Sequence, residues 1–265
     1  MVFEGNILKM RSKLSSPVEY KLPIGEHLLD LNALIGKKVK LEFNGQINCI
    51  ASGEKIKKSY NNGYSYKSFI SLPECDICIV RPELCHYDKG TCRDSKWGEK
   101  HCMQDHIVYL ANSSNAKIGI TRHTQVPTRW IDQGAIEALP ILRVPNRHIS
   151  GLIESEIKNS IGDKTNWRKM LKGEVEEVDL YDLRDQLFEE YGDLLDEFDA
   201  QDLDEEITYI DFPLDSPPEK IKSLSFDKTP LIEGNLKGIK GQYLIFDIGV
   251  LNIRKHQGYF IKISY

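Results

Sequence analysis

The feature that most constrains this fold is a concentration of cysteines in the first half of the chain. Five of the six cysteines lie at the spacing Cys75-x2-Cys78-x6-Cys85-x6-Cys92-x9-Cys102. The N-terminus shows no apolar run typical of a secretory signal, so we expect a reducing compartment, where thiols bind metals rather than pair as disulfides. Residues 51–106 also lack apolar periodicity, and a loop-rich segment of this kind needs a metal to fold.

Zinc is the metal that this cysteine pattern favours. Thiolate and imidazole are the ligands of tetrahedral Zn2+, and a C-x2-C pair points two sulfurs at one ion. We therefore expect one structural Zn2+ per chain, held chiefly by Cys75 and Cys78, with two or more of Cys85, Cys92 and Cys102 completing the site. Two alternatives stay open: an iron–sulfur cluster on four thiolates, or reduced and buried cysteines without a metal.

Charge is strongly segregated along the chain, although the net charge is only −5. Residues 1–173 carry 26 basic and 18 acidic side chains. Residues 174–215 carry one basic and 18 acidic side chains, and residues 216–265 carry eight basic and four acidic side chains. A basic body suits a polyanion such as DNA or RNA. The acidic segment could repel that polyanion, cover the basic face as a mimic, recruit a protein partner, or be only a solvated helix face.

Hydropathy argues for a soluble protein. No apolar run approaches the roughly 20 residues that a membrane helix requires. We therefore expect no membrane contact and a cytoplasmic location.

The apolar pattern predicts an α+β protein in five parts. These are a β region (1–70), a cysteine-rich module (71–105), an α/β domain (106–172), an acidic helical segment (173–206) and a second β region (207–265). Short alternating stretches predict that the first and last parts share one β-rich barrel or sheet. In the α/β part we expect strands at 106–111, 116–120 and 138–144, and a helix that begins at Ser150. An apolar stripe from Leu180 to Phe198 predicts a helix that packs on the core, with a partner-binding surface as the alternative.

Several long stretches are similar to a known family. The sequences CDICIVRPELCHYDKGTCRDSKWGEKHC, HIVYLANSSNAKIGITRHTQVPTRWIDQGAIEALPI and GIKGQYLIFDIGVLNIRK identify the chain as a member of an uncharacterised bacterial family, a domain of unknown function. Relatives of this kind carry an additional ribbon of the form C-x2-C followed by G-Y-C-x2-C. Here Cys49 is the remnant of that ribbon, with serines at positions 52, 65 and 68. The resemblance therefore implies one metal where relatives hold two.

The α/β part also resembles a divergent GIY-YIG nuclease domain. That superfamily has two strands bearing G-I-Y and Y-I-G, then an Arg on the first helix, a Glu on a later helix and often an Asn near the end. The matching positions here are Tyr109, Lys117 with Gly119, Arg129, Glu154 and Asn166. Lys117 stands where the second tyrosine is expected, and Arg129 lies somewhat further from Gly119 than is usual.

This resemblance implies a Mg2+-dependent endonuclease. Glu154 would hold Mg2+, Tyr109 would orient or activate water, and Arg129 with Arg122 would neutralise the phosphate. Lys117 and Asn166 complete the implied catalytic set. Each residue also has a structural interpretation, as a core tyrosine, a surface acid, a salt-bridged arginine or a helix cap.

Three functions thus remain open from the sequence. The first is a Mg2+-dependent nuclease with a structural zinc module, acting on DNA or RNA. The second is a zinc-containing protein that binds nucleic acid without cutting it. The third is an interaction scaffold that recruits a protein partner through the acidic segment.

Overall fold

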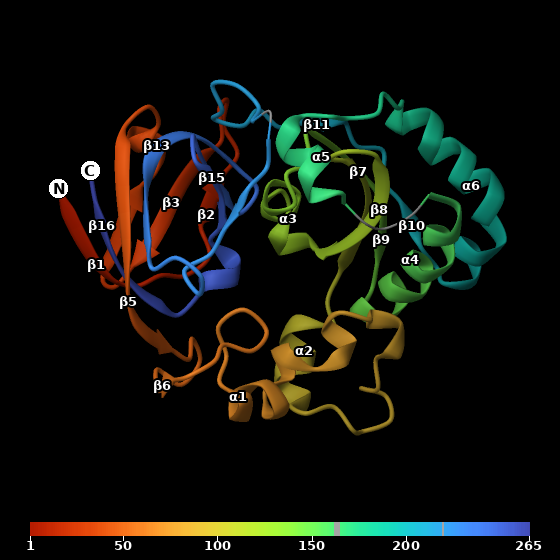
Figure 1. Cartoon of the computed structure of the whole chain (residues 1–265). Coiled ribbons are helices and arrows are strands. Elements are labelled where there is room, and N and C mark those ends of the chain that lie inside the picture. Colours follow the sequence, from red (N-terminus) through yellow and green to blue (C-terminus); the bar gives the residue numbers. More distant parts are fainter. Residues whose placement is uncertain (162–164, 219) are drawn as a thin grey trace. The chain divides into compact units, whose positions relative to one another are not determined.

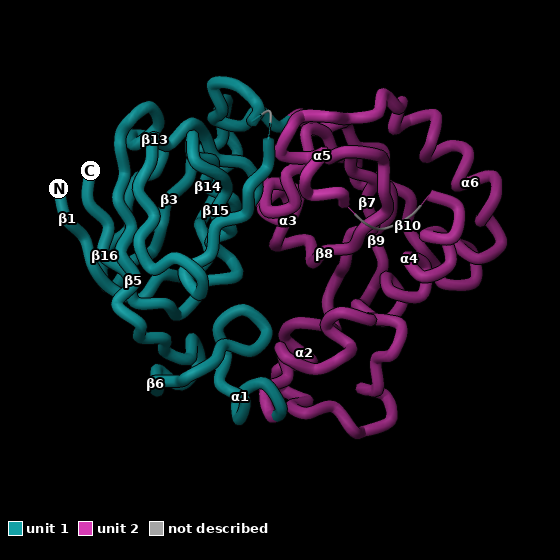
Figure 2. The backbone as a smooth tube through the Cα atoms, in the orientation of Figure 1, with its two compact units in different colours: residues 1–70, 210–265 teal, residues 71–209 magenta. Residues whose placement is uncertain are grey.

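The computed structural model describes residues 1–161, 165–218 and 220–265. The chain forms two compact units, one from residues 1–70 with 210–265 and one from residues 71–209 (Figure 2). Both contain helices and strands, so the fold is mixed α+β, as predicted. The finer five-part division stays a prediction.

A separate finding concerns membranes. None of the described helices combines the length and the apolar character needed to cross a bilayer.

Unit 1 is built mainly of strands. The strands are β1 (Val2–Asn6), β2 (Arg11–Lys13), β3 (Glu19–Ile24), β4 (His27–Asp30), β5 (Lys38–Asn48), β6 (Lys55–Ile56), β12 (Ser223–Leu224), β13 (Leu231–Lys240), β14 (Tyr243–Phe246), β15 (Gly249–Asn252) and β16 (Tyr259–Ser264). The short helices are η1 (Asn32–Leu34), α1 (Tyr66–Ser71) at the unit boundary, and η6 (Arg254–His256).

The two ends of the chain share one sheet in unit 1. Strand β1 pairs antiparallel with β16, and β5 pairs with both β16 and β13. The strand order is β1-β16-β5-β13-β14-β15-β12, with β6 also on β5, while β2, β3 and β4 form a separate sheet (Figure 1). In the part of the chain that the structure describes, this sheet does not close, because β1 and β12 end it at opposite edges. Of the two predicted forms, barrel or sheet, unit 1 therefore has an open sheet.

Unit 2 places helices around a smaller sheet. Its strands are β7 (His106–Asn112), β8 (Ala116–Arg122), β9 (Glu137–Val144), β10 (Gln201–Asp202) and β11 (Thr208–Tyr209). Its helices are η2 (Pro73–Cys75), η3 (Ile77–Ile79), η4 (Pro82–Leu84), α2 (Ser95–His101), η5 (His123–Gln125), α3 (Thr128–Asp132), α4 (Arg147–Ile161), α5 (Trp167–Lys172) and α6 (Leu180–Glu197). The strand order is β10-β9-β7-β8, with β11 also on β9.

Strand β7 is the centre of unit 2. All seven of its residues are buried, because helices cover both faces of the sheet: α4 and α6 lie on one side, and α3 and α5 on the other (Figure 1). Side chains alternate between the faces of a strand. Val108 and Leu110 therefore belong to the core beneath α4 and α6, whereas Tyr109 points to the opposite face, where it meets Trp130 of α3.

The acidic helix α6 is part of that core. Its residues Leu180, Leu187 and Leu195 are buried in the same cluster as Val108 and Leu110. Burial of each such leucine stabilises the fold by roughly 1.5–3 kcal/mol. The apolar stripe of α6 is thus core packing, and it covers the sheet face opposite Tyr109.

Helix α4 begins at Arg147, three residues before the predicted start at Ser150. The reason is an asparagine cap. The Asn146 side-chain oxygen accepts the backbone N–H of Ile149 at 2.9 Å, which satisfies one of the exposed donors of the first turn. Ser150 instead donates its hydroxyl to the carbonyl of Arg147 at 2.8 Å, inside the helix.

Cys49 and the three serines of the degenerate ribbon lie together in unit 1. The Sγ of Cys49 is 3.4 Å from the Ser68 hydroxyl, and the Ser65 hydroxyl donates to that of Ser68 at 3.1 Å. Burial raises the pKa of the Cys49 thiol, but hydrogen bonds from the side chains of Ser52 and Ser68 and from the backbone of Ser52 and Ser65 lower it to about 6. Hydroxyl groups thus stabilise a single thiolate at this position.

This arrangement predicts a pH-dependent effect of Ser68→Ala. Because the folded pKa of Cys49 lies below the usual thiol value of 9.0, the thiolate stabilises the fold fully above pH 9 and loses that effect as the pH falls to about 6. Ser68→Ala should lower the free energy of unfolding by about 1.5–3 kcal/mol at pH 9, the size of a charged hydrogen bond, and by less at pH 5. Urea denaturation at both pH values measures this. Ser223→Ala, at an exposed serine of the same unit, is the control, and equal losses for the Ser68 variant at both pH values contradict the prediction.

Candidate metal and phosphate sites

Four of the predicted cysteine ligands line one cavity in unit 2. The cavity wall contains Pro73, Asp76, Cys78, Cys85, His86, Tyr87, Cys92, Arg93, Trp97, Gly98 and Cys102. These residues come from η2, η3, the loops around η4 and helix α2, which carry few buried apolar side chains. None of the six cysteines, all of which the structure describes, forms a disulfide. The arrangement therefore offers sulfur, imidazole and carboxylate donors on a common wall.

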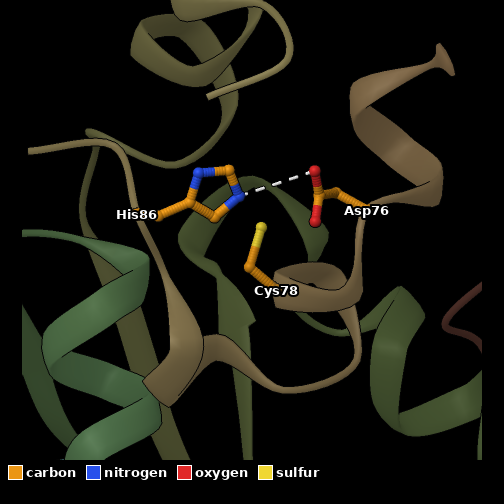
Figure 3. A group of neighbouring side chains, drawn as sticks. All are labelled: Asp76, Cys78 and His86. Atoms are coloured by element: carbon orange, nitrogen blue, oxygen red, sulfur yellow. Dashed lines mark ion pairs between the residues drawn. The ribbon is translucent and has the colours of Figure 1, made fainter. Parts of the chain in front are cut away.

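The most compact donor group in this cavity is Asp76, Cys78 and His86. One ligand atom from each lies within 4.8 Å of the other two. Figure 3 shows the Cys78 sulfur pointing into the gap between the imidazole and the carboxylate. Among the described residues, this is the one cluster of three such donors at that spacing. Its mixed sulfur, nitrogen and oxygen set suits zinc.

Neighbouring contacts distinguish the roles of Asp76 and His86. The Asp76 carboxylate is 2.7 Å from Nε of Arg93 and 3.5 Å from Nε2 of His86, so it already balances a guanidinium. The Nδ1 of His86 is 2.8 Å from the Thr91 hydroxyl. If Nδ1 carries the proton, Nε2 presents its lone pair to the cavity, which is the usual arrangement around a metal-binding histidine. His86 thus fits a ligand, and Asp76 fits the surrounding charge network.

The cavity sulfurs are close enough to influence one another. Burial and the charges of Asp76, Cys85 and Cys102 together raise the pKa of Cys78 to about 11, against the opposing effect of Arg147. Burial also raises the pKa of Cys102, which responds to Cys85, Cys92 and Arg147. A metal ion supplies the positive charge that converts such thiols to thiolate ligands.

Cys75 does not line the cavity. It is buried at the end of η2, whereas Cys78 lies within η3, and the extended backbone of Asp76 separates the two short helices. The x2 spacing predicts that Cys75 and Cys78 approach one ion from a single turn. The cavity wall contains Cys78, Cys85, Cys92 and Cys102, and Cys75 as a ligand stays a prediction.

Tyr109 occupies a closely fitted position on the other face of the unit 2 sheet. It is fully buried, and its hydroxyl donates to Oε1 of Gln133 at 3.0 Å. Its cross-strand partner on β8 is Gly119. A Cβ at Gly119 would lie 2.7 Å from both the Cζ and the hydroxyl of Tyr109. Glycine is therefore required at this position because the tyrosine ring lies across it.

Arg129 and Glu154 both influence this phenol electrostatically. Burial raises the pKa of Tyr109; the Arg129 guanidinium lowers it through its charge and a hydrogen bond, and the Glu154 carboxylate raises it. The net direction is upward, so the phenol stays protonated at neutral pH. Arg129 and Glu154 are both half-buried, on α3 and α4. Three residues from a strand and two helices therefore share one electrostatic environment.

The other predicted catalytic residues have structural partners. Buried Lys117 donates from Nζ to the Thr165 hydroxyl at 2.6 Å. The Asn166 side-chain oxygen accepts the backbone N–H groups of Arg168 and Lys169, and so caps α5. Arg122 ends β8 opposite His106, and its charge acts on Cys102 and His106. Arg122 thus lies toward the cysteine segment.

Sequence reasoning missed three residues that shape these sites. Gln133, one helical turn after Arg129, accepts the Tyr109 hydroxyl. Asp76 lies inside the C-x2-C spacer, where it pairs with Arg93. Arg147 is the third; its guanidinium donates to the carbonyl of Ile79 and responds to the charges of Cys78, Cys102 and Glu154. Only the i, i+4 spacing of Arg129 and Gln133 offered a signal in the sequence.

Comparison with known proteins identifies the family. The chain belongs to the family described as "Protein of unknown function (DUF2797)", whose model matches residues 36–261. This match confirms the resemblance to an uncharacterised family. No match was found among curated proteins or among solved structures. The metal and nuclease assignments stay predictions.

The separation of Cys75 from Cys78 predicts different effects of two matched substitutions. Cys78→Ser should abolish stoichiometric zinc binding and lower stability broadly, because metal binding is coupled to folding of the segment. Cys75→Ser should retain one zinc per chain. Elemental analysis of the purified proteins measures both outcomes. Loss of zinc from the Cys75 variant alone would instead support the C-x2-C pairing, and iron with visible absorbance would support an iron–sulfur cluster.

The fit between Tyr109 and Gly119 predicts a non-additive pair of substitutions. Gly119→Ala should lower the free energy of unfolding by about 1–3 kcal/mol, the usual cost of overpacking a core. Tyr109→Phe removes the hydroxyl that the new methyl would meet, so the double variant should lose less than the two single losses together. Chemical denaturation of the four proteins measures this. Additive losses would show that the Tyr109 hydroxyl does not contribute to the clash with a methyl group at position 119.

Proposed function

We propose that this protein is a metal-dependent phosphodiesterase that acts on nucleic acid, with a structural zinc ion in the cysteine cavity. The observation that carries the proposal is that the buried phenol of Tyr109 hydrogen-bonds Arg129 and lies within the electrostatic influence of Glu154. A guanidinium for the phosphate and a carboxylate for a divalent ion are the groups that phosphodiester hydrolysis requires.

The order of these residues along the fold supports the nuclease resemblance. Tyr109 lies on the central strand β7, Gly119 on its neighbour β8, Arg129 on the first following helix and Glu154 on the helix after β9. That is the order in which GIY-YIG domains carry their motifs. The two strands pair so that the tyrosine of the first motif lies directly opposite the glycine of the second.

The donor set fits Mg2+ rather than a second zinc ion. Glu154 is a single half-buried carboxylate, and Mg2+ is commonly held by one or two carboxylates while it keeps several waters. When bound there, Mg2+ would polarise the phosphate and stabilise the leaving oxygen. Arg129 would bind the phosphate and balance the charge that develops on it.

Tyr109 has a positioning role in this proposal. Its hydroxyl is buried, protonated and engaged with Gln133. A neutral phenol is a poor base, so of the two roles implied by the resemblance, orienting and activating water, the structure favours orientation. It would act through Arg129 and Gln133, which it holds in place.

Binding of nucleic acid without cleavage is the second candidate, and one observation favours it. Tyr109, Lys117 and Asn166 all engage structural partners, so each of these three implied catalytic residues has a role in the fold that needs no cleavage. A scaffold function through α6 has less support, because the apolar stripe of α6 lies in the core. The exposed acidic face of that helix remains the surface where a protein partner could bind.

The nuclease proposal predicts a specific effect of Glu154→Gln. This change should lower Mg2+-dependent cleavage of DNA or RNA by about 10²- to 10³-fold, the usual loss when one contact to the transition state is removed. Affinity for nucleic acid at low salt should stay within about threefold, because phosphate contacts dominate binding. Glu156→Gln, at an exposed acid on the same helix, is the matched control and should leave both properties unchanged.

Arg129→Ala separates the two candidates. It should weaken binding and cleavage together if the guanidinium contacts phosphate. If the wild-type protein binds nucleic acid but does not cleave it in Mg2+ or Mn2+, the non-catalytic function is favoured. Absence of both binding and cleavage at low salt would contradict both nucleic-acid functions and favour a scaffold.

A further inference from the structure

Arg147 is a half-buried cation attached to the cysteine segment. It is the first residue of α4, and its backbone N–H donates to the carbonyl of Cys102 at 2.9 Å. Its Nη2 donates to the carbonyl of Ile79, the neighbour of Cys78, at 2.6 Å. Its Nε is buried without a hydrogen-bond partner. A half-buried guanidinium of this kind requires a nearby negative charge.

The charges around Arg147 come from both candidate sites. Cys78 and Cys102 of the metal cavity influence its guanidinium electrostatically, and so do Glu154 and Arg129. A metal centre takes its cysteines as thiolates, so a Zn2+ ion with three or four of them carries net negative charge. Arg147 is placed to balance that charge.

Helix α4 is held against the cysteine segment along one stripe. Gly151, one turn after Arg147, lies so close to η4 that a Cβ there would be 2.4 Å from Cβ of Pro82. Residues at i, i+4 and i+7 fall on the same face of an α-helix. Arg147, Gly151 and Glu154 have this spacing, so the face that contacts the cysteine segment also carries the proposed Mg2+ ligand.

We propose that Arg147 is a positioning residue that couples the two sites. Its guanidinium balances a metal–thiolate centre in the cysteine cavity, and this pairing fixes the stripe of Arg147, Gly151 and Glu154 on α4. The coupling to Glu154 rests on the proposed nuclease function, whereas the pairing with the metal centre does not. Zinc in the cavity would then determine how well the protein binds a divalent ion at Glu154.

The first experiment measures zinc retention in the full chain. Zn2+-loaded protein is challenged with a chelator, and released zinc is followed with time. Arg147→Met, which keeps the length of the side chain but removes its charge, should lower zinc affinity about 10- to 100-fold, as is typical for groups that support metal ligands. Arg147→Lys should restore most of the affinity. Arg143→Met, at an exposed arginine of β9, should behave as wild type.

The second experiment measures Mn2+ binding by electron paramagnetic resonance, which does not depend on cleavage. Glu154→Gln defines the signal from the proposed site. Removal of zinc from the wild-type protein should weaken Mn2+ binding. The Arg147→Met variant with zinc bound should show Mn2+ binding weakened by the same factor. Removal of zinc from that variant should weaken its Mn2+ binding little further. The comparison of Mn2+ binding by the wild-type protein with and without zinc tests the coupling even if the Arg147→Met variant does not fold.

The outcomes separate the two proposals. Unchanged Mn2+ binding in Glu154→Gln contradicts the proposed active site, and zinc retention then decides the role of Arg147 alone. If Glu154→Gln strongly weakens Mn2+ binding but removal of zinc from the wild-type protein does not, the coupling is overturned and the proposed active site is supported. Zinc release from Arg147→Met at the rate of Arg143→Met overturns the pairing with the metal centre, as does failure of the wild-type protein to take up Zn2+.

Discussion

The docking of helix α4 on the cysteine segment is the interaction on which the candidate sites depend. That segment has little hydrophobic core of its own, since Ile77, Val80 and Leu84 are exposed. Instead, its main chain accepts hydrogen bonds from Arg147 and packs closely against Gly151. A segment with so little apolar burial gains stability from such contacts and from bound metal. The same docking sets the position of α4, and hence of Glu154.

The buried strand β7 organises the rest of unit 2. One face supplies Val108 and Leu110 to a core shared with α4 and the acidic helix α6. The other face carries Tyr109, whose ring lies across Gly119 and whose hydroxyl meets Gln133. The apolar core and the Tyr109 side chain thus occupy opposite faces of one strand. This division allows a strongly acidic helix to exist in a protein proposed to bind a polyanion, because that helix packs on the face away from Tyr109.

Much of the local structure was predictable because it follows from short-range patterns. Two short apolar runs at 106–111 and 116–120, joined by a polar turn, predict two strands, and the structure has them as β7 and β8. The helical stripe from Leu180 predicts α6. The start of α4 was placed at Ser150 instead of Arg147, because Asn146 and Ser150 are both residue types that cap helices. Only the hydrogen bond from Ile149 to Asn146 distinguishes them.

The sequence by itself determined the kinds of chemistry present: a crowd of thiols, a basic body with one acidic segment, and a tyrosine, an arginine and a glutamate in the order of a nuclease family. Tertiary structure decided which of these residues meet. It placed Cys78 in the cavity and left Cys75 outside it, and it engaged Lys117 and Asn166 with structural partners. It also joined Arg147 to the cysteine segment through the carbonyls of Ile79 and Cys102. Spacing along the chain fixes residue type and local periodicity, but contacts between distant segments depend on how helices and strands pack.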